Sequence, residues 1–376
     1  MEKLHSAFAS LFDVNMGVQP GERVVVFSDT VRPDESPDGF DADRRSRLHA
    51  TARSAAAYGA ETCGNTTFVE YPATAASGAE PPEQLWREVF GAALVAELGD
   101  GGLLGRLLAK EATPADLEQA TALVRSRRTE VAGVVIAMAN NSTSHTRFRH
   151  LVNAAGGRFA SLPHFDPEMF FTSMAVDWQA LAQRTARLAE AVNRACGLRL
   201  STPNGTRLSF STEGRRAEGD DGLLTAPGSF GNLPAGEVYL APLERTSEGE
   251  LVIEYAPTRR LVSPLRLTVR QGEVVAIDGD EPYRVWLEEK FAASRLNRNI
   301  AELGIGTNDR ASSPDNILEA EKILGTIHVA LGDNSGFGGT VSTPFHEDYV
   351  FYRPTLIALL PGGGELVLID DGVHRV

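Results

Sequence analysis

The chain has 376 residues, of which 42% are apolar and 23% are charged. This composition is typical of a globular protein and excludes a largely disordered or fibrous one, and the length predicts two domains. The 50 acidic and 36 basic residues give a formal charge of −14. Such a charge repels phosphate backbones and anionic lipids, so it excludes nucleic acid and membrane surfaces as partners.

Neither the cysteines nor the apolar segments indicate secretion or a membrane span. Cys63 and Cys196 match no metal-binding spacing and no disulfide framework, which is typical of a reducing compartment. The N-terminal segment lacks the continuous apolar core of a signal peptide. The longest apolar runs, such as residues 131–139, are well short of the ~20 residues that cross a bilayer. We therefore expect a cytoplasmic protein.

Strand-like and helical segments alternate through the first half of the chain. The predicted strands cover residues 21–27, 66–70, 130–138 and 157–162, and the predicted helices cover residues 1–17, 45–58, 82–98, 114–127 and 144–154. A long amphipathic helix beginning at Trp178, with Asp177 as its predicted N-cap, closes this part. Alternation of this kind predicts parallel pairing. We expect an N-terminal α/β domain with a mostly parallel sheet over residues 1–196.

The second half consists of short alternating segments separated by turn residues, which is typical of antiparallel strands. The predicted strands cover residues 198–202, 206–212, 236–242, 250–256, 265–269, 273–277, 325–332, 347–352 and 355–360, with helices at 282–293 and 316–324. We expect a C-terminal α+β domain over residues 197–376 that carries a metal site.

The first chemical signal is a pair of histidines close to a carboxylate. His346 and Asp348 are two residues apart, so on a strand both side chains leave the same face. His328 lies in the segment GTIHVALG and points away from the apolar row of Ile327 and Val329. A single metal ion could contact the first two side chains. Taken singly, such a pair also fits a surface ion pair.

Two glutamates stand among apolar and small residues, Glu237 in AGEVYLAP and Glu302 in NIAELGIG. A buried charge there requires a partner or a cation, although a lone strand glutamate also fits a solvated sheet face. With His328, His346 and Asp348 they form the mixture of imidazoles and carboxylates that binds zinc, cobalt, manganese or iron. The glycine-rich segment 332–340 joins the two histidine strands, and we expect it to shape a pocket.

At these residues the sequence resembles the aminopeptidase T family of metallo-aminopeptidases and their relatives. The matching segments run from about residue 140 to 356 and include NNSTSHTRFRHLVNAAGGRF, LPAGEVYLAPLERTSEGELVIEYA, NIAELGIGTN, NILEAEKILGTIHVALGDN and FHEDYVFYRPTL. The resemblance implies a homodimer and a two-metal site of zinc, cobalt or manganese. Its implied ligands are Glu237, Glu302, His328, His346 and Asp348.

The resemblance also implies catalytic roles. Glu302 would handle the proton of the attacking water, while two cations polarise a peptide carbonyl. The aminopeptidases carry a tyrosine shortly after the histidine that corresponds to His328, and here that stretch reads GDNSGFGG. Tyr352 is our candidate for the missing phenol, with Tyr349 as the alternative.

The same superfamily includes non-haem iron dioxygenases that open dihydroxypyridine rings. Under that interpretation His328, His346 and Asp348 form a facial triad that binds one iron(II) and leaves positions open for substrate and oxygen. Glu237 and Glu302 would then either contact the ligands from outside or act as acid–base groups, and His145 would reach the substrate across a dimer interface.

Three functions follow, all with a peptide or small molecule as the partner. The first prediction is a metal-dependent aminopeptidase-like hydrolase that releases N-terminal residues from peptides. The alternative is an iron(II) extradiol-type dioxygenase that acts on a dihydroxypyridine-like ring. The third is a catalytically silent binding protein that keeps the family fold.

Overall fold

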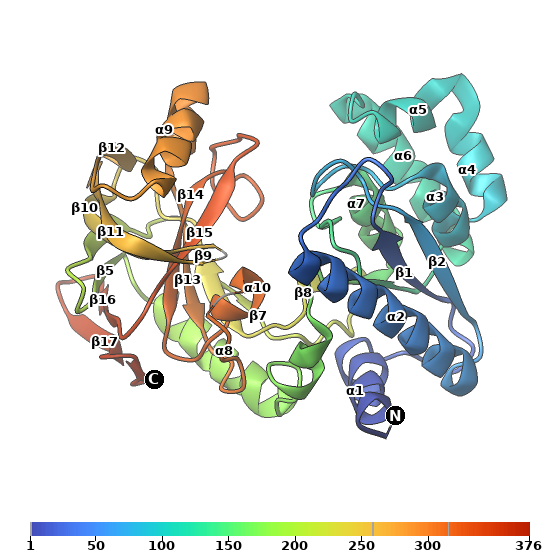
Figure 1. Ribbon diagram of the computed structural model, residues 1–376, viewed down its shortest axis with the longest axis horizontal. Helices are drawn as coiled ribbons and strands as arrows, with labels where there is room; N and C mark the ends of the chain where they lie inside the picture. Colours follow the sequence, from blue (N-terminus) through green and yellow to red (C-terminus); the bar gives the residue numbers. More distant parts are fainter. Residues whose placement is uncertain (1, 258, 315) are drawn as a thin grey trace. The chain divides into compact units, whose positions relative to one another are not determined.

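A computed structural model describes residues 2–257, 259–314 and 316–376 (Figure 1). Contacts divide the chain into two compact units. The first contains the chain up to Trp178 and the segment Gly222–Pro234, and the second contains Gln179–Asp221 and Ala235–Val376. Within the described ranges, no helix has the length and apolar character that a membrane span requires.

The first unit is built on a parallel sheet in the order β2-β1-β3-β4-β8. Its strands are β1 (Val24–Thr30), β2 (Thr66–Pro72), β3 (Val134–Ala137), β4 (Arg158–Ser161) and β8 (Phe230–Asn232). Its helices are α1 (Glu2–Ala9), η1 (Ser10–Asn15), α2 (Gly39–Thr62), α3 (Glu83–Phe90), α4 (Ala92–Gly99), η2 (Asp100–Gly102), α5 (Leu103–Leu108), α6 (Pro114–Ser126), η3 (Arg128–Glu130), α7 (Arg147–Ala154) and η4 (Pro167–Phe171). The parallel sheet that the alternating pattern predicted is confirmed.

Both faces of this sheet are covered, which explains why its central strands are continuously apolar. Along β1, Val25 and Phe27 join the core formed with α3 to α7, whereas α2 packs against β1 and β2. The helix predicted over residues 82–98 is broken in two, because Gly91 adopts a φ of 86° between α3 and α4. The next predicted helix begins later than expected, because Thr146 and not Ser144 caps α7.

The second unit contains two antiparallel sheets, in the orders β12-β11-β10-β6-β5-β16-β17-β18 and β15-β14-β13-β9-β7. The strands of the first are β5 (Gly197–Ser201), β6 (Arg207–Ser211), β10 (Glu248–Ala256), β11 (Arg259–Arg270), β12 (Glu273–Asp278), β16 (Thr355–Leu359), β17 (Glu365–Asp370) and β18 (Val373–His374). The second contains β7 (Glu218–Asp220), β9 (Glu237–Leu240), β13 (Ile300–Gly306), β14 (Ile327–Gly332) and β15 (His346–Phe351). The helices of the unit are α8 (Trp178–Val192), α9 (Tyr283–Ala293), η5 (Arg295–Arg298) and α10 (Ile317–Ala320). One apolar core joins residues from both sheets, α8 and α9, so the expected α+β organisation is confirmed.

The compact units differ from the predicted division after residue 196 in two respects. Helix α8 belongs with the second unit from Gln179 onward, because Leu188 and Val192 pack into that unit's core. The segment Gly222–Pro234 returns to the first unit, where β8 extends the sheet beside β4.

His374 lies in β18 and makes the second unit's stability dependent on pH. Burial of the imidazole, together with repulsion from Arg184, lowers the pKa of His374 to about 4. The unfolded chain takes up this proton near pH 6.5, so the native state loses stability as the pH falls from about 6.5 to 4.

We expect His374→Gln to flatten the pH dependence of the unfolding free energy by about 1–2 kcal/mol between pH 7 and pH 4, since partial exposure reduces the full effect. Urea unfolding at a series of pH values measures this difference. Parallel curves for the variant and the wild-type protein would contradict it.

Candidate metal site

Three neighbouring strands bring the predicted ligands to one face of a sheet. Ala330 of β14 pairs with Glu302 of β13 on one side and with Asp348 of β15 on the other. His328 lies two residues before Ala330 and pairs with Gly304. Because side chains alternate along a strand, these carboxylates and this imidazole emerge from the same face.

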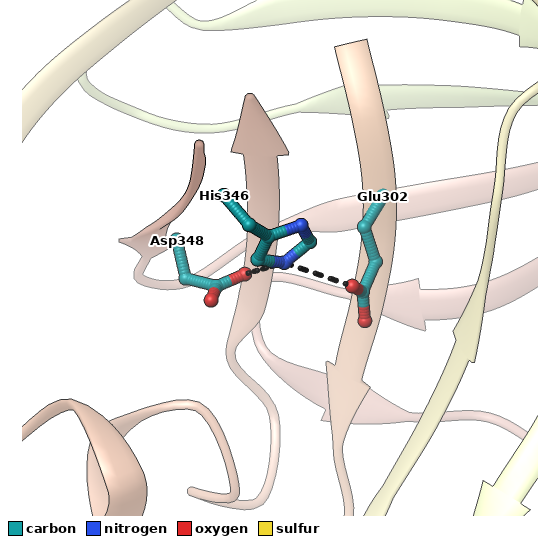
Figure 2. A group of neighbouring side chains, drawn as sticks. All are labelled: Glu302, His346 and Asp348. Atoms are coloured by element: carbon teal, nitrogen blue, oxygen red, sulfur yellow. Dashed lines mark ion pairs between the residues drawn. The ribbon is translucent and has the colours of Figure 1, made fainter. Parts of the chain in front are cut away.

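The five predicted ligands converge in the structure. His346 Nε2 lies 3.3 Å from Glu302 Oε2 and 3.6 Å from Asp348 Oδ1, so the imidazole stands between two carboxylates (Figure 2). His328 Nε2 lies 3.5 Å from Glu302 Oε1 and 3.5 Å from Glu237 Oε2. Glu302 therefore presents one oxygen to each histidine.

The site is closed at one end and accessible at the other. The His328 side chain is 2% exposed and the Glu237 side chain 10%, whereas the His346 side chain is 33% exposed. A substrate can therefore approach on the side of His346.

The His328 imidazole fits because the residue beside it has no side chain. A Cβ added at Gly304 would overlap the imidazole ring, so only glycine leaves room for it on β13. The small residue in NIAELGIG thus has a direct role in placing a candidate ligand.

A backbone carbonyl fixes the tautomer of His346. The Nδ1 atom lies 2.8 Å from the carbonyl oxygen of Asp333, which can only accept a hydrogen bond, so Nδ1 donates. The lone pair of Nε2 in the neutral ring then faces Glu302 and Asp348. Histidines that bind metals are commonly oriented in this way.

Mutual attraction perturbs the charges in the site. Burial alone would raise the pKa of Glu302, but the imidazoles of His328 and His346 lower it well below its usual range. Burial would lower the pKa of both imidazoles, but neighbouring carboxylates raise it, to about 9 for His328 and well above the usual value for His346. Without a bound cation, the carboxylates of this ligand set attract protons to the two imidazoles.

Two residues that the sequence patterns did not predict also reach the site, Glu321 and Lys322, which follow α10. Lys322 is 1% exposed, and its Nζ contacts Glu237 Oε1 and lies 2.9 Å from Glu321 Oε1. Burial raises the pKa of Glu321 to about 7. No local pattern marks Lys322, because its contact with Glu237 joins segments that are far apart in the sequence.

The other predicted residues lie elsewhere. Tyr352 packs its ring against Tyr255, at 5.2 Å between centroids. The Tyr349 side chain is buried in the core, with its hydroxyl 3.1 Å from that of Tyr283. His145 is exposed in the first unit, in the loop before α7. The catalytic role of Tyr352 and the substrate-binding role of His145 stay predictions.

The donor set fits a divalent metal ion. The ligand atoms of Glu302, His346 and Asp348 all lie within 4.8 Å of one another, and so do those of Glu321, His328 and Asp348. Among the described residues, the buried atoms Glu237 Oε2, His328 Nδ1 and Asp348 Oδ1 have no hydrogen-bond partner. Buried polar atoms normally have one, and a cation near these carboxylates would satisfy two of the three.

A sequence model of the 2,5-dihydroxypyridine 5,6-dioxygenase family, NicX, matches residues 110–359, about two-thirds of the chain. The chain belongs to this family. The match contains all five predicted ligands, and it confirms the expectation that the chain is related to ring-opening dioxygenases. A search of curated proteins found no match.

Two solved structures share the fold of this NicX family member. The 2,5-dihydroxypyridine dioxygenase from Pseudomonas putida KT2440 has a TM-score of 0.68 at 18% identity, over 99% of this chain and 97% of that one. Wild-type AmpT from Thermus thermophilus has a TM-score of 0.62 at 15% identity, over 100% and 99%. These similarities establish the fold, and the related proteins are enzymes.

Proposed function

We propose that this protein is an iron(II)-dependent dioxygenase that opens a dihydroxypyridine or a related hydroxylated N-heteroaromatic ring. The observation that carries the proposal is the family match, which contains the histidines and carboxylates that converge on one sheet face. Both atoms of O₂ enter the product, and the ring carbons supply the electrons, so the reaction requires no separate reductant.

His346 and Asp348 would hold the metal on the side of Glu302, because ligand atoms of these three residues lie within 4.8 Å of one another. An iron(II) ion bound there would supply open positions for a chelating ring and for oxygen. His346 is oriented for this role by the carbonyl of Asp333, and the exposed side of the site is the side from which a ring can enter.

Glu302 is our candidate for the group that moves a proton. Its Oε1 atom lies 3.5 Å from His328 Nε2 and its Oε2 atom lies 3.3 Å from His346 Nε2, so the carboxylate is directly beside the metal position. It can therefore accept a proton from a ring hydroxyl as the substrate chelates.

The glycine-rich loop supplies an aromatic wall. Phe337 meets the His346 ring edge to face, at 5.9 Å between centroids, and meets Tyr239 at 6.0 Å. A flat heteroaromatic substrate gains favourable contacts beside such rings.

Oxygen uptake by the iron-loaded protein tests the proposal. Protein purified without oxygen and loaded with iron(II) is mixed with 2,5-dihydroxypyridine, other dihydroxypyridines and catechol. We expect consumption of one O₂ per ring and loss of the ring's absorbance with at least one of the pyridines. A folded, iron-loaded protein that consumes no oxygen with any of them would overturn the proposal.

A two-metal aminopeptidase is the second candidate. It is favoured by the two overlapping ligand groups that share Asp348 and by the position of Glu302 between the histidines. Loaded with zinc, cobalt or manganese, such an enzyme would release N-terminal residues from a panel of small peptides.

A further inference from the structure

We propose that the Lys322 ammonium takes the place of a second metal ion, so that the site holds one divalent cation, on the side of Glu302, His346 and Asp348. This inference rests on the proposed function for the location of the metal. According to this proposal, Lys322 determines whether the centre binds one metal ion or two.

The contacts of Lys322 place a permanent positive charge at the closed end of the site. Its Nζ contacts Glu237 Oε1 and lies 2.9 Å from Glu321 Oε1, and its side chain is 1% exposed. Asp220 of β7 adds a further favourable charge interaction. A buried ammonium with two carboxylate partners is held firmly, because breaking either pair would leave an uncompensated charge in the interior.

The second ligand group depends on these same carboxylates. It consists of Glu321, His328 and Asp348, with Glu237 Oε2 3.5 Å from His328 Nε2. Lys322 therefore already pairs with both Glu237 and Glu321, the two glutamates near His328 at this end of the site. A divalent ion bound there would lie close to the ammonium in a poorly solvated space, where like charges repel strongly.

The first ligand group has no such competitor. Its histidine, His346, is paired through Nε2 with Glu302 and Asp348, and its Nδ1 is held by a carbonyl oxygen. The contacts of Lys322 are with Glu237 and Glu321, neither of which belongs to this group. A first cation therefore binds here, and Asp348, which both groups share, is then occupied.

Metal stoichiometry tests the role of Lys322 independently of activity. Metal-free wild-type protein, Lys322→Met and Lys322→Arg are each titrated with zinc and with manganese, desalted and measured by elemental analysis. We expect about one ion per chain for the wild-type protein and Lys322→Arg, and about two for Lys322→Met, which removes the charge but keeps the length of the side chain.

Two results would overturn the proposal: two ions in the wild-type protein, or one ion in folded Lys322→Met. Circular dichroism reports folding, and if Lys322→Met does not fold, Lys322→Gln takes its place, with the wild-type stoichiometry as an independent test. Absence of oxygen uptake by protein that holds one metal would reject the proposed reaction and leave the role of Lys322 intact.

Discussion

Replacement of His346 by alanine is expected to weaken metal binding at least about 100-fold and to reduce turnover to background. His346 Nε2 stands between Glu302 and Asp348, so its loss removes the central donor of the accessible ligand group. Only Glu302 and Asp348 of this group would then remain as ligands, and the ion would lose the oriented imidazole nitrogen. Elemental analysis after desalting and titration with a chelating competitor measure the change.

The matched control is His150→Ala, which removes an exposed histidine from α7 in the first unit. It should leave metal content unchanged. Urea unfolding of metal-free His346→Ala measures the loss of stability separately, because removal of the imidazole leaves Glu302 and Asp348 without this positive partner. Unchanged metal content in His346→Ala would show that the site assignment is wrong.

A large loss of stability in the first unit is expected from Asp29→Ala. Asp29 is 3% exposed, and its two oxygens accept the backbone N–H groups of Asn140 and Asn141 at 2.7 and 3.1 Å. The substitution leaves both donors without an acceptor, which should reduce the free energy of unfolding by about 2–4 kcal/mol. It should also loosen the start of the loop that carries His145.

Two measurements separate these effects. Urea unfolding reports the loss of stability, and amide hydrogen exchange at Asn140 and Asn141 reports local opening of the loop. Asp34→Ala serves as the control, because this exposed aspartate forms a surface pair with Arg32 and should cost less than about 1 kcal/mol. Equal unfolding midpoints for Asp29→Ala and Asp34→Ala would contradict the prediction.

The sheet classes and most of the candidate site follow from local patterns. A period of two is sufficient to place His346 and Asp348 on one face, and the structure brings them together. The apolar row that contains Ile327 and Val329 packs into the core, which leaves His328 on the opposite face. Alternation of strands and helices likewise predicts the parallel sheet, because such connections cross over one face.

Other features depend on tertiary contacts that no local pattern encodes. In the sequence, Lys322 looks like an ordinary helix residue. Its importance arises only because the fold places it beside Glu237, which lies eighty-five positions earlier in the chain. Strand β8 is three residues long, which is too short to show the alternation of apolar and polar residues that indicates a strand. Gly91 ends a helix through its positive φ, whereas a single glycine in a helical pattern is often tolerated.

The segments of the two units alternate along the chain, so the first unit cannot complete its fold until part of the second unit has been synthesised. Strand β8 completes the first sheet beside β4, but it emerges from the ribosome only after β5, β6 and β7, which belong to the second unit. A fragment that ends at residue 196 would therefore expose the edge of β4, and an open edge of this kind invites pairing with other chains. Neither unit is one continuous stretch of the chain, and their four segments alternate, so neither truncation nor circular permutation separates this protein into its two units.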